Sequence, residues 1–229
     1  MVDQNTAAIV AMAWARTCGL PDDAFAAGSG RLYASTDGDA ITVVRLLGRT
    51  IVHAPQWALE IAESYSDESL IETHGLLALA REHQPHATRV SSLMYADDYI
   101  ADGSLEQARV TDDEQAVRDL LRRCAPDDAD LDGLLAHEYR FVVLDEDDDP
   151  QAAAAYSARQ DILADLTMVD AIDARGNGSL QVAAALAMHD ALDAGLIPQL
   201  RVGVDDSHDL ADSLGFTRLG TLATVLVGA

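Results

Sequence analysis

Hydrophobic and polar positions alternate with two different periods along the N-terminal section, residues 1–100. Apolar residues from Thr6 to Cys18 recur at helical spacing and stop at Gly19, which predicts an amphipathic helix. Two runs rich in β-branched residues, Ala40–Leu47 and Thr50–His53, are separated by Gly48-Arg49 and predict a β-hairpin or a meander. The other elements expected here are strands at Arg31–Ser35 and Val90–Tyr95 and helices at Pro55–Tyr65 and Ser69–Glu82.

A polar passage, Asp97–Glu106, is the best candidate for a domain boundary. We therefore expect two domains, residues 1–100 and residues 105–229. After the boundary, Thr111 and Glu114 match a capping box in front of a helix that carries Val117. The remaining elements expected are strands at Gln107–Val110, Arg140–Leu144, Ala152–Ala158, Ile162–Val169, Leu200–Val204, Phe216–Leu219 and Thr221–Val227, and helices at Ala129–His137, Ser179–Ala194 and Ser207–Ser213.

This order of elements indicates an α+β protein. The second domain is expected to be a mixed sheet of about seven strands with helices on both faces, preceded by a smaller α+β domain of unknown role. Hydrophobic residues make up 49% of the chain but aromatic residues only 5%, so the core must consist chiefly of Ala, Val, Leu and Ile.

The charge of the chain narrows the choice of partners. Its 39 acidic residues face 15 basic ones, all of them Arg, and the formal net charge is −24. Such a field repels phosphate backbones and anionic lipid surfaces, so neither nucleic acid nor a membrane is an expected partner. The excess of acid fits an adaptation for solubility, for salt tolerance or for a GC-rich genome. A role in attracting a cationic amine is the alternative.

Cysteine and histidine spacing gives no sign of a metal site. Cys18 and Cys124 lie far apart, without the spacing of a zinc site or a disulfide framework, and the scattered histidines form no recognisable metal set. The sequence also has no apolar run of about 18 residues and no basic leader before an apolar stretch, which favours a cytoplasmic location.

The loop Arg175-Gly176-Asn177-Gly178 lies between a predicted strand and a predicted helix. The first amides of a helix lack internal partners and carry partial positive charge, and glycines let a phosphate approach the backbone. Gly176 and Gly178 alone fit a tight turn equally well, and the third glycine of a dinucleotide fingerprint is missing.

The residues around this loop extend the pattern. Ala174–Gly178 is followed by a mostly apolar helix, then by Ala194–Pro198 and a strand, and finally by Ser213–Gly220 with its Leu-Gly-Phe. This arrangement resembles the GNAT superfamily of N-acetyltransferases over roughly Glu106 to the C-terminus.

The resemblance implies that acetyl-CoA is the co-substrate, with its pyrophosphate on the loop and its pantetheine on the preceding strand. Leu180 stands where the family usually has Gly or Ala, and another register would place Asp173 at the first loop position instead of Arg175. The cofactor-binding residues that it implies are Leu166, Thr167, Met168, Val169, Arg175, Gly176, Asn177, Gly178, Ser179 and Leu180.

The match is poorer at the position of the general acid. Ala211 stands where many members carry a Tyr, and His208, Ser207 and Ser213 are the nearby side chains that could supply a proton. Asp161 and Asp165 lie on the strand where several relatives carry an acidic base. The expected catalytic residues are therefore Asp165, Asp161 and His208.

The expected function is transfer of an acetyl group from acetyl-CoA to a primary amine of a small molecule or peptide. The alternative is a non-catalytic acyl-CoA-binding or regulatory module. The sequence leaves the oligomeric state open, with a homodimer as one option.

Overall fold

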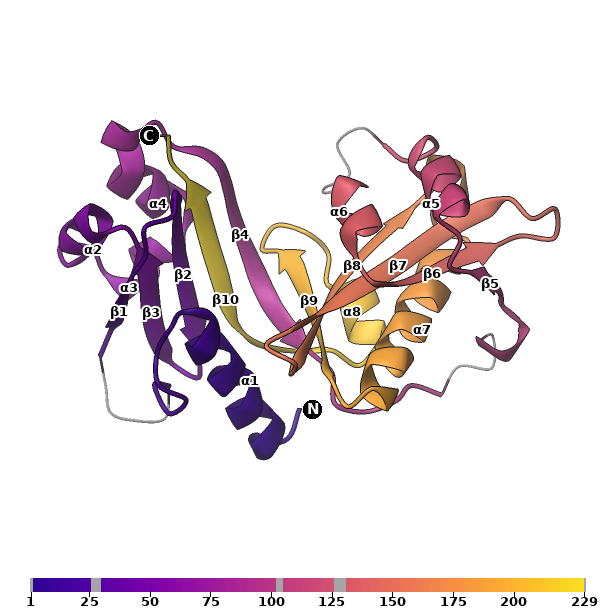
Figure 1. Ribbon diagram of the computed structural model, residues 1–229, viewed down its shortest axis with the longest axis horizontal. Coiled ribbons are helices and arrows are strands. Elements are labelled where there is room, and N and C mark those ends of the chain that lie inside the picture. Colours follow the sequence, from indigo (N-terminus) through magenta and orange to yellow (C-terminus); the bar gives the residue numbers. More distant parts are fainter. Residues whose placement is uncertain (1, 26–29, 102–104, 126–130, 229) are drawn as a thin grey trace. The chain divides into compact units, whose positions relative to one another are not determined.

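The computed structural model describes residues 2–25, 30–101, 105–125 and 131–228 (Figure 1). These divide into two compact units. The first unit comprises residues 96–200 and 209–216, and the second comprises residues 2–95, 201–208 and 217–228, within the described ranges. Residues 102–104 of the predicted linker lie outside the described part of the chain.

The contiguous division into residues 1–100 and 105–229 is therefore corrected. The change of unit near residue 96 lies close to the predicted boundary, but the end of the chain groups with the N-terminal section. The cause is the last strand, β10 (Thr217–Leu226), which pairs with a strand of the N-terminal section along each of its edges.

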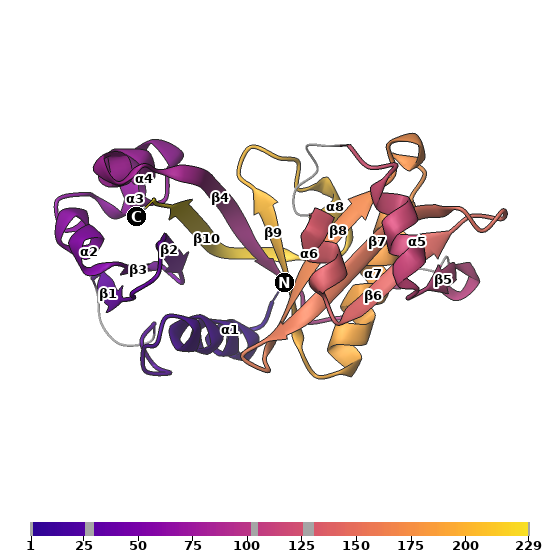
Figure 2. The ribbon, with the colours of Figure 1, turned by 45° about the horizontal axis from the view of Figure 1, so that its top comes forward.

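The second unit has strands in the order β1-β3-β2-β10-β4, and Figure 2 shows β4 and β10 side by side. β1 and β3 are parallel and the other pairs antiparallel. The predicted hairpin is confirmed, with Leu47 and Gly48 at φ 51° and 79° in its turn. The elements are α1 (Gln4–Thr17), β1 (Leu32–Ser35), β2 (Ala40–Leu46), β3 (Arg49–Ala54), α2 (Gln56–Ala62), α3 (Asp67–Leu70), α4 (Thr73–Ala80), a 3₁₀ turn at Arg81–His83, β4 (His86–Tyr95) and β10.

Two predictions for these elements were wrong. The expected helix Ser69–Glu82 is divided into α3 and α4, and Gly75 of α4 packs so closely against the end of α3 that a Cβ there would lie 1.9 Å from the Ser69 carbonyl oxygen. The two strands expected at the C-terminus are one strand, β10, with a register shift between Arg218 and Gly220.

The first unit has strands in the order β9-β8-β7-β6-β5, antiparallel except for the parallel pair of β8 and β9. The helix α7 covers one face of β6, β7 and β8, and α5 and α6 cover the other (Figure 1). The elements are a 3₁₀ turn at Leu105–Gln107, β5 (Arg109–Thr111), α5 (Glu114–Leu121), α6 (Leu131–Ala136), β6 (Tyr139–Leu144), β7 (Pro150–Arg159), β8 (Leu163–Asp170), a 3₁₀ turn at Ile172–Ala174, α7 (Ser179–Asp193), β9 (Ile197–Gly203, whose last residues group with the second unit) and α8 (Asp209–Ser213).

Small side chains let helices approach both faces of this sheet. Ala152, Ala153, Ala154 and Ala155 of β7 are all buried, and α7 buries a stripe of alanines. Ala153 and Ala155 belong to the cluster that α5 and α6 cover. Since side chains alternate along a strand, Ala152 and Ala154 face α7. The expectation of a core built chiefly from Ala, Val, Leu and Ile is confirmed.

The start of α5 differs from the predicted capping box. Asp113 is the N-cap, and its Oδ1 accepts from the Gln115 amide at 2.9 Å. Thr111 is the last residue of β5, and its hydroxyl oxygen accepts from the Asp113 amide at 3.2 Å. The predicted start of the next helix at Ala129 lies outside the described residues.

Candidate active site

The strands β8 and β9 part in the middle of β8. Their ladder joins Leu163 to Ile197, Ala164 to Pro198 and Asp165 to Gln199, and over the described residues it ends there. The ladder between β8 and β7 continues to Asp170. The edge of β8 that faces away from β7 therefore carries no β9 partner over Leu166–Val169, the stretch predicted to hydrogen-bond a pantetheine chain.

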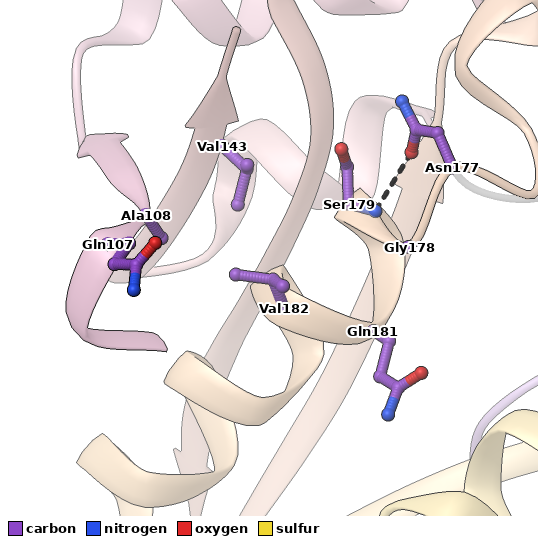
Figure 3. Close-up of a pocket in the computed structure, with 8 residues that line it drawn as sticks. All are labelled: Gln107, Ala108, Val143, Asn177, Gly178, Ser179, Gln181 and Val182. Carbon is purple, nitrogen blue, oxygen red and sulfur yellow. Dashed lines mark hydrogen bonds between the residues drawn. The ribbon is translucent and has the colours of Figure 1, made fainter. Parts of the chain in front are cut away.

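The predicted loop lies between the end of β8 and the start of α7. Gly176 and Gly178 have φ values of 79° and 91°, a region that favours glycine, and a Cβ added to either would meet no atom within 4 Å. Gly178 is the N-cap of α7 and has no side chain to cap it. The Asn177 side chain accepts from the Ser179 amide at 2.9 Å, as Figure 3 shows. The first backbone bond of the helix is donated by the Val182 amide to the Gly178 carbonyl oxygen, so the amides of Leu180 and Gln181 come before the intrahelical pattern begins.

A pocket of about 320 Å³ adjoins the first turn of α7. Figure 3 shows Val182 of α7 and Val143 of β6 along it, with Gln107 and Ala108 opposite the helix. Asn177, Gly178, Ser179 and Gln181 complete its lining. The start of α7 is thus accessible beside an apolar wall.

The charges near the loop favour the register with Arg175 at its first position. Arg175 is half-exposed, and its Nε lies 3.4 Å from the Asp170 carboxylate at the end of β8. Asp173, the first residue of the other register, lies in a 3₁₀ turn, where Arg123 donates to both its carboxylate oxygens at 2.9 Å. The arginine side chain lowers the pKa of Asp173. Asp173 is therefore bound to the body of the unit, whereas Arg175 stands beside the glycines.

Leu180 does not prevent the loop from forming. It occupies the first turn of α7 and is half-buried, and Gly178 keeps the open conformation described above. The predicted cofactor-binding residues thus lie on β8, on the loop that follows it and in the first turn of α7.

Asp165 is the last residue of β8 that pairs with β9, and 20% of its side chain is exposed. Its carboxylate forms an ion pair with Arg159 and accepts from the Gln199 side-chain amide at 2.8 Å. Gln199 is fully buried and was not singled out in the sequence. A polar residue directly after Pro198, at the start of an apolar strand, was the available signal.

The other two predicted catalytic residues lie elsewhere. Asp161 is not on the strand: it is exposed in the turn between β7 and β8, where Gln160 and Asp161 have φ values of 56° and 54°. Two successive positive φ values are typical of a type I′ hairpin turn. That turn lies at the opposite end of β8 from the loop. His208 groups with the second unit, and its Nε2 is buried without a hydrogen bond to the described residues.

The position of the usual tyrosine is filled by a buried methyl group. Ala211 of α8 is 3% exposed, and its carbonyl oxygen accepts from the Phe216 amide at 3.0 Å. Ser213 is exposed, and its hydroxyl donates to the Leu210 carbonyl at 2.7 Å. Ser207 is exposed as well.

Sequence reasoning also missed His137, which follows α6. Its Nδ1 lies 2.9 Å from the Ser157 hydroxyl of β7, and its Nε2 lies 3.2 Å from the Thr167 hydroxyl of β8. Nothing in the local sequence indicates these partners, because they come from two strands that follow later in the chain.

The fold of this protein is similar to that of solved acetyltransferases. A structure from Novosphingobium aromaticivorans, assigned to the GNAT acetyltransferase family, matches with a TM-score of 0.52 at 16% identity, over 64% of this chain and 68% of that one. A GCN5-related N-acetyltransferase from Kribbella flavida matches at 0.49 and 18% identity over 68% and 64% of the two chains. A protein from Streptococcus suis, described as like these enzymes, matches at 0.48 and 16% identity over 82% and 84%.

No protein-family model and no curated protein matches the sequence. The first structural match is sufficient to define the architecture, and the protein has the mixed α+β GNAT fold with flanking helices.

Two further findings concern the described residues alone. Their helices are all too short or too polar to cross a membrane. Their His, Cys, Asp and Glu side chains form no group of three or more that could hold a metal ion.

Proposed function

We propose that the first unit binds acetyl-CoA and transfers its acetyl group to a primary amine. The observation that carries this proposal is the early end of the β8–β9 ladder at Asp165 and Gln199. It leaves the backbone edge of Leu166–Val169 without a β9 partner, and an extended amide-containing chain can pair with such an edge as an additional strand.

The loop after β8 suits the binding of the anionic end of the same ligand, its pyrophosphate. Gly176 and Gly178 leave space for a pyrophosphate, and the start of α7 offers backbone amides and the positive end of a 15-residue helix dipole. Arg175 adds a guanidinium group at the edge of the loop. An extended strand edge that leads into an anion site fits the two halves of coenzyme A.

Binding of acetyl-CoA is tested by thermal unfolding. A ligand that binds only the folded state stabilises it by about 2.7 kcal/mol at a hundredfold excess over its dissociation constant. We expect millimolar acetyl-CoA to raise the Tm, and an unchanged Tm would contradict the proposal.

A substitution in the loop tests whether acetyl-CoA binds at Arg175–Gly178. Gly178→Glu places a side chain and a negative charge in the anion site, so it should abolish the Tm shift. Gly195→Glu is the matched control: Gly195 also has a positive φ, 76°, and open space around it, but it follows the C-terminus of α7. If both variants keep the shift, acetyl-CoA binds elsewhere.

A second candidate function is a non-catalytic acyl-CoA-binding module. The observation in its favour is Ala211, whose buried methyl group cannot protonate a leaving thiolate. The two functions differ in thiol release from acetyl-CoA in the presence of amines: the enzyme accelerates it, and the binding module does not.

A further inference from the structure

A row of polar side chains crosses the face of the first unit's sheet that α5 and α6 cover. Ser157 pairs with Asp165 and Ala155 with Thr167 across the antiparallel strands β7 and β8, so these four side chains share one face. Ala155 belongs to the core cluster with Val117 of α5 and Leu134 of α6, which identifies that face.

His137, the residue that directly follows α6, adds its side chain to this row. Its ring lies between the two strands, with one nitrogen against the Ser157 hydroxyl and the other against the Thr167 hydroxyl. Arg140 fixes the backbone by donating to the His137 carbonyl oxygen at 2.7 Å. A hydroxyl can both donate and accept, so the arrangement suits a neutral imidazole that donates from Nδ1 and accepts at Nε2.

Thr167 connects this imidazole to the proposed acyl site. It belongs to Leu166–Val169, the segment of β8 without a β9 partner, and its side chain is half-exposed. Asp165 lies two residues earlier, and its carboxylate already accepts from Arg159 and Gln199. Thr167 thus has an imidazole nitrogen against its hydroxyl and lies in the strand segment that has no β9 partner.

We propose that His137 receives the proton of the acceptor amine through the Thr167 hydroxyl, in place of Asp165. The proposal rests on the proposed acetyltransferase function. As the nitrogen–carbon bond forms and the carbon–sulfur bond breaks, the amine proton passes to Thr167 Oγ1 and the hydroxyl proton passes to His137 Nε2. The departing thiolate takes up one proton from solvent, and His137 later returns its own.

The groups around His137 set its charge state together. Asp165 and Arg159 lie on the same face from β8 and β7, Arg140 contacts the carbonyl oxygen of His137, and Glu138 is the exposed next residue. Each of these can change the pH at which the imidazole titrates. None changes the direction of the effect: a protonated His137 cannot accept the proton, so kcat should fall on the acid side of the pH profile.

The test compares His137→Gln with Asp165→Asn in the full chain, with acetyl-CoA and spermidine, kanamycin or a lysine-containing peptide as acceptors. Removing a general base typically lowers the rate by about 10²–10⁴-fold. We expect His137→Gln to lower kcat by about that factor, to remove the acid limb of the profile and to leave the Kd for acetyl-CoA within about twofold. Asp165→Asn should keep the acid limb.

Variants of Thr167 test the relay itself. Thr167→Val should lower kcat as His137→Gln does, and Thr167→Ser, which keeps the hydroxyl, should restore it. His86→Gln, an exposed histidine of the second unit, is the control for loss of an imidazole.

The outcomes separate the two proposals. If acetyl-CoA binds and thiol release depends on amine, but the acid limb survives in His137→Gln or disappears in Asp165→Asn, the assignment to His137 is wrong and the proposed function stands. If kcat and acetyl-CoA affinity fall together in His137→Gln, the residue is only structural. A wild-type chain that releases no thiol with any of the three acceptors overturns both proposals.

Discussion

At the scale of single residues, the first unit contains a tyrosine–carboxylate pair that the sequence did not indicate. Tyr156 of β7 is buried, and its hydroxyl donates to Asp190 of α7 at 2.5 Å. Its ring stacks on Tyr139 of β6, with centroids 4.7 Å apart. Burial, with the hydrogen bond to Asp190 as the next cause, raises the pKa of Tyr156 well above its usual 10.0.

This pair predicts a pH-dependent stability. Because the native pKa of Tyr156 is raised, its contribution to the free energy of unfolding is complete below pH 10 and is lost as the pH rises above it. Tyr156→Phe should lower the stability at pH 7 by about 1–3 kcal/mol, since Asp190 loses its donor, and should make the alkaline decline shallower. Denaturant unfolding at pH 7 to 11 measures both effects.

Tyr99→Phe is the matched control for this prediction. The Tyr99 hydroxyl also donates to a carboxylate of α7, Asp193, at 2.8 Å, but Tyr99 is 52% exposed. Exposed partners exchange their hydrogen bond for water at little cost, so the change should be much smaller. Equal effects of the two variants would show that burial is not the cause.

At the scale of elements, two positions require glycine for different physical reasons. Gly178 needs its positive φ at the start of α7 but has open space around it. Gly220 lies in β10, where a Cβ would stand 2.1 Å from the Arg45 carbonyl oxygen of β2. One residue is conformationally constrained and the other sterically constrained.

Alanine substitution should separate these constraints. Gly178→Ala costs the left-handed conformation of one residue, about 1–2 kcal/mol. Gly220→Ala must push β10 and β2 apart and should cost clearly more, since close packing leaves no room for a methyl group. Urea unfolding of the two variants tests the order, and a larger loss for Gly178→Ala would contradict it.

The elements also show which features the sequence can predict. The loop Arg175–Gly178 and helix α7 are local, so glycines and periodicity were sufficient to find them. The end of the β8–β9 ladder and the contact of His137 with Thr167 depend on strands brought together by the fold. Asp161 was misplaced because two residues with positive φ, neither of them glycine, form its turn. The tendency of Asp to adopt that conformation is only moderate.

At the scale of the whole molecule, the order of segments along the chain does not reveal how they divide between the two units. β10 follows the GNAT-like segments in the chain yet pairs with β2 and β4 of the N-terminal section. A strand pattern predicts that a segment pairs, but not with which partner. The mixed character of the sheet was therefore predicted correctly, whereas the two strands expected at its end are one strand, β10, which belongs to the other unit.

The net charge of −24 leads to a prediction about the acceptor. A negative potential concentrates cationic amines and raises their rates of association, so polyamines, aminoglycosides and basic peptides should be better acceptors than acidic amines. The same potential holds an amine in its protonated form, and only the neutral amine attacks, so a proton acceptor becomes more necessary.

Ionic strength distinguishes this role of the charge from one in solubility alone. At physiological salt the Debye length is about 8 Å, so charges farther than this from the acceptor are largely screened. We expect kcat/KM for spermidine to fall as salt rises from about 0.01 to 0.5 M, while kcat/KM for a neutral amine such as benzylamine changes little. Thiol release measured across this range tests the expectation. A preference for acidic or neutral acceptors, or a cationic preference unchanged by salt, would mean that the charge does not select the substrate.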